Sequence, residues 1–102
     1  MTRIIEMELT ELEIPKDMFK KVPKMASAHL YMLSKETMAI TFDKSPEFAQ
    51  KSIWNDKIII KETDKSLIFV LPQIVTSFYH IIPTNVSVSV SQKTDTIHVD
   101  IE

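Results

Sequence analysis

Residues 86 to 91 read Val-Ser-Val-Ser-Val-Ser, the most regular pattern in the chain. Successive side chains of a β-strand point to opposite faces, so this alternation of apolar and polar residues predicts a strand with one buried face. Residues 96 to 101 alternate again after a polar break at residues 92 to 95. We therefore expect the C-terminal part of the chain to consist of two β-strands joined by a turn.

The segments before this pair extend the β-rich pattern. Residues 67 to 71 form a continuous apolar run, which indicates a strand buried on both faces. Together with residues 58 to 60 they flank the polar turn at residues 62 to 66, and this predicts a hairpin that ends at Pro72. Gln73 to Ile81 is predicted as a short apolar helix.

The first half of the chain repeats this order of elements. Residues 5 to 9 alternate, and residues 12 to 14 form a second short strand that ends before Pro15. Pro15 and Pro23 bound a predicted helix of about two turns. A hairpin is expected from His29 to Phe42.

A linker helix is predicted between the halves. The sequence Ser45-Pro46-Glu47 provides an N-cap, a proline at the first helical position and an acid in the first turn. We expect this helix to continue to Trp54.

The repeated order of elements indicates an internal duplication, in which Pro15 and Pro72 mark equivalent points. We divide the chain into a first repeat at residues 1–42, a linker helix at residues 43–56 and a second repeat at residues 57–102. A unit of about 45 residues is too small to bury a core alone. Residues 1–102 are therefore expected to form a single domain.

The composition restricts the classes of function. The chain has 102 residues, of which 44% are hydrophobic and 25% charged, close to ordinary globular usage. The absence of cysteine excludes disulfides and thiolate chemistry, and the absence of glycine excludes glycine-dependent phosphate loops and the nucleophile elbow of hydrolases. Turns must rely on Asn, Asp, Ser, Thr and Pro. With neither a signal peptide nor a membrane span in the sequence, we expect a cytoplasmic protein.

The order strand, strand, Leu-Pro or Ile-Pro, short helix, Ile-x-Pro, strand, turn, strand resembles the swapped-hairpin module of the AbrB/SpoVT-like family. Residues 56 to 102 match it in element order and nearly every spacing, and residues 3 to 42 match it more loosely. Two copies in one chain look like the tandem arrangement of MraZ-type proteins. The resemblance implies a β-rich α+β pseudo-dimer of two hairpin-exchanging units, and a DNA-binding regulator. A double-psi barrel, which also contains two duplicated units, is the alternative fold.

The chain departs from this family at the family's charged positions. Leu67-Ile68 stand in place of a Gly-Arg pair, and Thr76 and Ser77 stand in place of basic residues on the helix. The corresponding helix positions in the first half are Phe19 and Lys20. The resemblance therefore rests on the apolar residues and the prolines.

The candidate DNA-binding residues are basic side chains around the first predicted helix. Lysines that recur at i, i+4 and i+8 on a helix would share one face, where each could neutralise a phosphate. The competing interpretation is a solvated face whose field is partly cancelled by neighbouring Glu and Asp residues. The candidates are Arg3, Lys16, Lys20, Lys21 and Lys24.

The sequence does not predict an enzyme, a metal site or a cofactor. No serine or carboxylate pair comes with a recognisable base and oxyanion framework. Among His29, His80 and His98, no two have the spacing of a zinc site. His98 and Asp100 share one face of a predicted strand, and we interpret them as surface residues.

Two functions remain. The first is a DNA-binding transcriptional regulator that contacts mainly the phosphate backbone. Homodimerisation would double its basic surface. The second is a non-enzymatic protein-interaction module, of antitoxin or viral or plasmid accessory type. The resemblance favours DNA, whereas the net charge of −2 favours a protein partner. A contiguous basic face would support the first function, and lysines interleaved with carboxylates would support the second.

Overall fold

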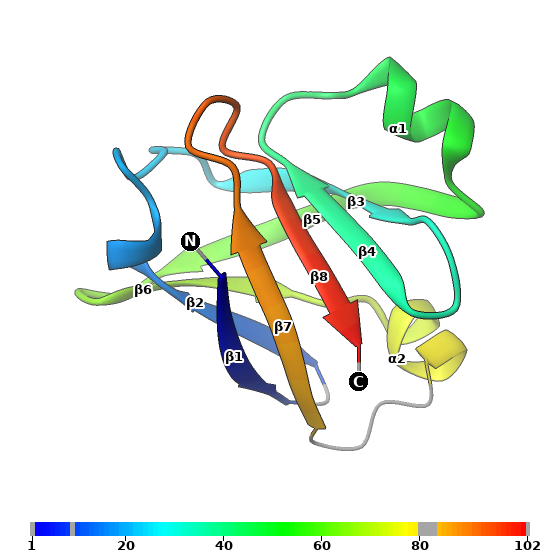
Figure 1. Cartoon of the computed structure of the whole chain (residues 1–102), viewed down its shortest axis with the longest axis horizontal. Coiled ribbons are helices and arrows are strands. Elements are labelled where there is room, and N and C mark those ends of the chain that lie inside the picture. The colour runs from blue at the N-terminus through cyan, green and yellow to red at the C-terminus, as the bar shows by residue number, and fades with distance from the viewer. Residues whose placement is uncertain (1, 9, 80–83, 102) are drawn as a thin grey trace.

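The computed structural model describes residues 2–8, 10–79 and 84–101, and they form the β-rich α+β fold shown in Figure 1. No helix in these ranges is both long and apolar enough to cross a membrane. The elements in chain order are β1 (Thr2–Met7), β2 (Glu11–Pro15), the 3-10 helix η1 (Lys16–Met18), β3 (Ser27–Met32), β4 (Thr37–Thr41), α1 (Pro46–Lys51), β5 (Trp54–Glu62), β6 (Ser66–Val70), α2 (Gln73–Tyr79), β7 (Thr84–Val90) and β8 (Ile97–Ile101).

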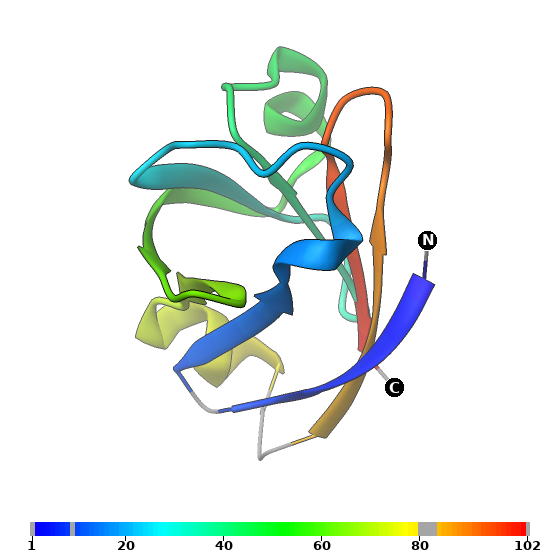
Figure 2. The ribbon, with the colours of Figure 1, turned by 90° about the vertical axis from the view of Figure 1, so that its left-hand side faces the viewer.

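The strands form an antiparallel sheet that curls into a nearly closed barrel. Their order is β1-β7-β8-β4-β3-β5-β6-β2, so β1 and β2 are its two ends, and no ladder joins them among the described residues. Figure 2 shows these two strands diverging from each other along their length. The barrel is therefore open along one line, the β1–β2 seam, between Thr2–Met7 and Glu11–Pro15.

Most of the ladders join the first half of the chain to the second. β1 pairs with β7, β2 with β6, β3 with β5 and β4 with β8, whereas β3–β4, β5–β6 and β7–β8 pair within a half. The cross-half ladders set Leu12 opposite Phe69 and Ile40 opposite Ile97. Strands from both halves thus surround one core, with β7–β8, β4–β3 and β5–β6 as adjacent pairs from one half.

The alternating pattern at residues 86 to 91 predicted the buried face correctly. Val86, Val88 and Val90 are at most 2% exposed, while Ser87 and Ser89 on the opposite face stay partly open to solvent. The strand formed by the apolar run, β6, lies between β5 and β2 as an internal strand. The expected burial on both faces is wrong, because Ile68 and Val70 on its outer face stay partly exposed. The largest fully buried side chains are Tyr31, Phe69, Met7, Leu12, Ile14, Met18, Leu30, Met32, Met38, Ile40, Leu67 and Ile97.

The other hairpins and the last helix also agree with the sequence. The predicted hairpin from His29 to Phe42 is β3–β4, and the next is β5–β6. The predicted helix from Gln73 is described to Tyr79, and Ile81 lies outside the described residues. The Tyr79 hydroxyl donates to the carbonyl oxygen of Ser34 at 2.8 Å, which ties α2 to the β3–β4 turn. Burial raises the pKa of Tyr79 to about 12.

The linker helix begins where predicted but ends earlier. The Ser45 hydroxyl accepts from the backbone N–H of Phe48 at 3.3 Å, and Pro46 occupies the first helical position. The expected continuation to Trp54 is wrong, because Ser52 is already extended (φ −76°, ψ 146°) and Trp54 pairs with Met32 as the first residue of β5. Cross-strand pairing with β3 thus prevails over local helix propensity.

The predicted two-turn helix between Pro15 and Pro23 is also wrong. Only Lys16–Met18 form a single 3-10 turn, and Phe19 is extended at φ −99°, ψ 137°. Met18 and the adjacent Phe19 are both buried, at 0% and 5% exposure. The chain leaves the helical conformation at Phe19, whose backbone N–H donates to the carbonyl oxygen of Lys16 at 3.1 Å. The predicted shared helix face for Lys16, Lys20 and Lys24 is therefore absent.

Candidate nucleic-acid interface

Three of the five candidate residues lie together on the loop between η1 and β3. Lys20, Lys21 and Lys24 are exposed there, and no hydrogen bond or ion pair engages their side chains within the described part of the chain. The buried side chains of Met18 and Phe19 fasten the start of this loop to the barrel. The lysines are therefore displayed from an anchored segment of the fold.

Lys16 differs from these three because a carboxylate already engages it. Its Nζ atom lies 2.7 Å from Oε2 of Glu62, at the end of β5, and its side chain is only 23% exposed. The hydrogen bond from Lys16, followed by its charge, lowers the pKa of Glu62, and the charge of Lys24 adds to this effect. Lys24 therefore lies near enough to Glu62 to feel its field, although its ammonium makes no ion pair there.

Arg3 is likewise engaged. Its Nη1 atom donates to Oδ1 of Asp17 at 3.0 Å, which links β1 to η1. The five candidates thus divide into two residues held by carboxylates, Arg3 and Lys16, and three that project into solvent. The structure brings Lys16 and the loop lysines to one region, with carboxylates interleaved at its edge.

A second loop lies beside the lysines. The side-chain amide of Gln92 donates to the carbonyl oxygen of Met18 at 3.1 Å, and this bond joins the β7–β8 loop to η1. Asp95 from that loop, together with Lys21 and Lys24, lines a shallow hollow of about 350 Å³. Lys93 is exposed on the same loop. The η1–β3 loop and the β7–β8 loop therefore lie side by side, and each carries at least one exposed lysine.

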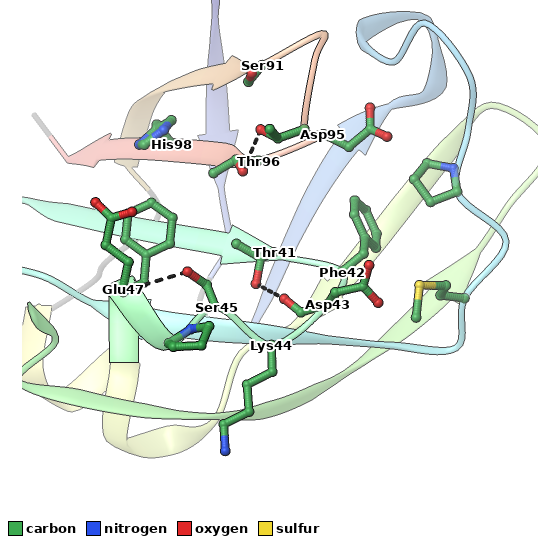
Figure 3. Close-up of a pocket in the computed structure, with 15 residues that line it drawn as sticks. Thr41, Phe42, Asp43, Lys44, Ser45, Glu47, Ser91, Asp95, Thr96 and His98 are labelled. Carbon is green, nitrogen blue, oxygen red and sulfur yellow. Dashed lines mark hydrogen bonds between the residues drawn. The ribbon is translucent and has the colours of Figure 1, made fainter. Parts of the chain in front are cut away.

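A larger open groove of about 690 Å³ lies between the β7–β8 loop and the segment from β4 to α1. Figure 3 shows Ser91, Asp95, Thr96 and His98 on one side of it and Thr41, Asp43, Ser45 and Glu47 on the other. Lys44 extends away from the other labelled side chains. Its lining residues are Pro23, Met25, Thr41, Phe42, Asp43, Lys44, Ser45, Pro46, Glu47, Phe48, Ser91, Thr94, Asp95, Thr96 and His98.

Hydrogen bonds and a ring contact join the β4–α1 side of this groove to the barrel. The Thr41 hydroxyl donates to the carbonyl oxygen of Asp43, and the Tyr31 hydroxyl accepts from the backbone N–H of Ser45 at 2.8 Å. The His98 ring packs edge-on against Phe48, with ring centroids 6.1 Å apart. These contacts are those of a structural network that holds the β4–α1 segment on the barrel.

The described residues contain no group of three or more His, Cys, Asp or Glu side chains that could hold a metal ion. Asp100, which shares a strand face with His98, accepts a hydrogen bond from the Thr37 hydroxyl at 3.2 Å. His29 lies on β3, and His80 is outside the described residues. The expectation that the chain is not an enzyme stays a prediction.

Sequence reasoning missed the contribution of the β7–β8 loop to this region. Asp95 adopts a positive φ of 54° there, and its backbone N–H donates to the carbonyl oxygen of Ser91 at 2.8 Å. The available signal was the lack of glycine, since Asp is one of the few other residues that accept this conformation. That signal marks a turn but cannot show that the turn lies beside the lysines.

Comparison with known proteins adds no assignment, since no family model, no curated protein and no solved structure matches the chain.

Proposed function

We propose that the chain is a small DNA-binding regulator that contacts mainly the phosphate backbone through Lys20, Lys21 and Lys24. The observation that carries this proposal is the exposure of these ammonium groups on one anchored loop, with no ion pair to them among the described residues. Ammonium groups in this state can neutralise phosphates and release counterions without first breaking an internal contact. Lys93 on the neighbouring loop extends the basic surface.

Within this proposal the five candidates take different parts, because two of them already contact carboxylates. Arg3 and Lys16 already neutralise Asp17 and Glu62, so either would exchange one carboxylate for a phosphate on binding DNA. They are assigned a supporting role at the edge of the surface. A surface without a free arginine favours backbone contacts over reading of guanine edges.

We also infer that the fold is a duplicated, hairpin-exchanging pair of units, as in the AbrB-like family that the sequence resembles. A duplication would make β1, β2, β3 and β4 equivalent to β5, β6, β7 and β8. Exchanging equivalent strands converts the ladder between β1 and β7 into the one between β5 and β3, and the ladder between β7 and β8 into the one between β3 and β4. The β2–β6 and β4–β8 ladders convert into themselves. Leu12 faces Phe69, and Ile40 faces Ile97. The two partners are the same number of residues apart in the sequence in both pairs. A two-fold axis that relates the halves and passes through both pairs requires this equal spacing. The β5–β6 ladder would convert into β1–β2, which do not pair among the described residues, and the other six ladders support the proposed pseudo-dimer.

Fluorescence anisotropy with a labelled mixed-sequence duplex tests DNA binding directly. We expect binding at low salt with a log–log salt slope of about −3, since roughly three lysines would each displace a counterion. Lys20→Glu combined with Lys24→Glu should abolish it. The matched control is Lys35→Glu combined with Lys57→Glu, which makes the same charge change at exposed positions on the β3–β4 turn and β5. An absence of binding at low salt, or an equal loss in both variants, would contradict the proposal.

A protein-interaction module is the second candidate function, and one observation favours it. Carboxylates are interleaved with the basic residues in the pairs Arg3–Asp17, Lys16–Glu62 and Lys61–Glu11. Interleaved charges of this kind suit a protein surface better than a polyanion. Failure of the DNA experiment would leave this function as the proposal.

A further inference from the structure

The β1–β2 seam presents two strand edges without a neighbouring strand. Within the described residues β1 pairs only with β7 and β2 only with β6, whereas each of the other strands has a neighbour on both sides. The edge of a sheet exposes backbone N–H and C=O groups that can pair with another chain. The seam is therefore where this barrel can accept an additional strand.

Like charges explain why β1 and β2 do not pair with each other. Glu6 and Glu8 on the β1 side, and Glu11 and Glu13 on β2, line a hollow of about 110 Å³ together with Ile68. Pairing the strands with their buried faces aligned would set Glu6 opposite Glu11 or Glu13. Like charges directly opposite each other destabilise a strand pair. By contrast, the two strands of the β5–β6 hairpin do pair with each other. The outward residue opposite Ile68 in that hairpin is a lysine, Lys61.

An exposed ion pair bridges one end of the seam, where β1 begins and β2 ends. Arg3 and Asp17 make this contact at 3.0 Å, with side chains that are 37% and 70% exposed. Exposed ion pairs contribute little to stability. An entering strand would have to displace this contact at the end of the seam.

We propose that the β1–β2 seam binds an extended, lysine- or arginine-rich segment of a partner protein as a strand added along β1. The backbone of the segment would hydrogen-bond to the edge of Thr2–Met7, as in other cases of strand addition. Alternate side chains would point outward, where basic residues would meet the glutamates, of which Glu11 already contacts Lys61. The remaining side chains would pack against the partly buried Ile5 of β1. None of the loop lysines lines the hollow at the seam, so the inference does not rest on DNA binding, although Arg3 lies at the edge of both surfaces.

A synthetic heptapeptide of alternating lysine and valine, with a fluorescent label, is the probe for this site. Its binding to the full chain is measured by anisotropy, and hydrogen exchange of the backbone amides locates the contact. We expect binding together with slower exchange at residues 2 to 7. A second peptide, with proline in place of each valine, keeps the charge but removes alternate N–H donors, and it should bind at least about tenfold more weakly.

Two variants of the chain test the charge component. Glu6→Gln combined with Glu13→Gln should weaken binding of the lysine–valine peptide about fivefold, because two exposed charge pairs are lost. Glu36→Gln combined with Asp64→Asn removes two exposed carboxylates from turns outside the seam and should leave binding unchanged. The proposal is overturned if the proline peptide binds as tightly, if both double variants respond alike, if the slowed amides lie elsewhere, or if the peptide does not bind.

Discussion

Asp95 holds a backbone conformation that a chain without glycine has few ways to reach. Its φ is 54°, in the left-handed region where Asn and Asp are the most tolerant residues other than glycine. Two backbone hydrogen bonds close the turn around it, from Asp95 N–H to Ser91 O and from Ser91 N–H to Thr96 O, each at 2.8 Å. The position of the β7–β8 loop beside the lysine surface thus depends on this residue.

We predict that Asp95→Val lowers the free energy of unfolding by about 1 to 2 kcal/mol, because a β-branched residue is strained at positive φ. Asp95→Asn should have little effect. Urea denaturation followed by circular dichroism measures both variants. Lys93→Val is the control, since it places the same side chain in the same loop at a position without a positive φ. Equal losses for the two valine variants would show that the backbone conformation is not the cause.

The Lys16–Glu62 contact predicts an acid-dependent part of stability. The pKa of Glu62 is lowered in the folded chain, so the unfolded state binds more protons in acid. The contribution is therefore present above the ordinary pKa of 4.5 and is lost as the pH falls through the lowered value. We expect Glu62→Gln to be less stable than the parent chain near pH 7 and to approach it in stability below about pH 4. Urea midpoints across this range measure the difference, with Asp64→Asn as a control, and a difference that stays constant with pH would count against it.

At the scale of single elements, the sequence predicted what local chemistry determines. The Val-Ser alternation and the cap at Ser45 each depend on neighbours in the chain, and both formed as expected. The continuous run at residues 67 to 71 formed the expected strand but is fully buried on one face only. The helix expected after Pro15 is instead one 3-10 turn followed by an extended Phe19, whose side chain is buried in the barrel. Trp54 joined β5 through its pairing with Met32.

The candidate site was predictable as a set of residues but not as a surface. The η1–β3 loop lysines were found from their clustering in sequence, whereas their separation from Arg3 and Lys16 depends on ion pairs to residues elsewhere in the fold. Asp17 is next to Lys16 in sequence yet pairs with Arg3, and Glu62 comes from the second half of the chain. Such ion pairs depend on which strands are neighbours in the sheet. The alternation of apolar and polar residues in the sequence does not specify that strand order. The open β1–β2 seam lay beyond sequence reasoning for the same reason.

At the scale of the whole molecule, the strand order makes the two halves depend on each other. Each of the ladders β1–β7, β2–β6, β3–β5 and β4–β8 needs a strand from both halves. The ladders within one half are hairpins, and an isolated hairpin is at best marginally stable in water. The cooperative unit of folding should therefore be the full barrel, whatever surface the protein uses for binding.

Cutting the chain within the exposed region after α1 tests this dependence. We predict that fragments 1–51 and 52–102 each lack cooperative unfolding as monomers, because each would expose the apolar face that the other covers. Mixed in equal amounts, they should recover β-type circular dichroism, a sigmoidal urea transition and the size of the intact chain in gel filtration. A fragment that folds only by pairing with a second copy of itself would agree with the proposed duplication, since the copy would supply the equivalent strands. A fragment that folds cooperatively as a monomer would contradict the dependence, because its hairpins would then be stable without the cross-half ladders.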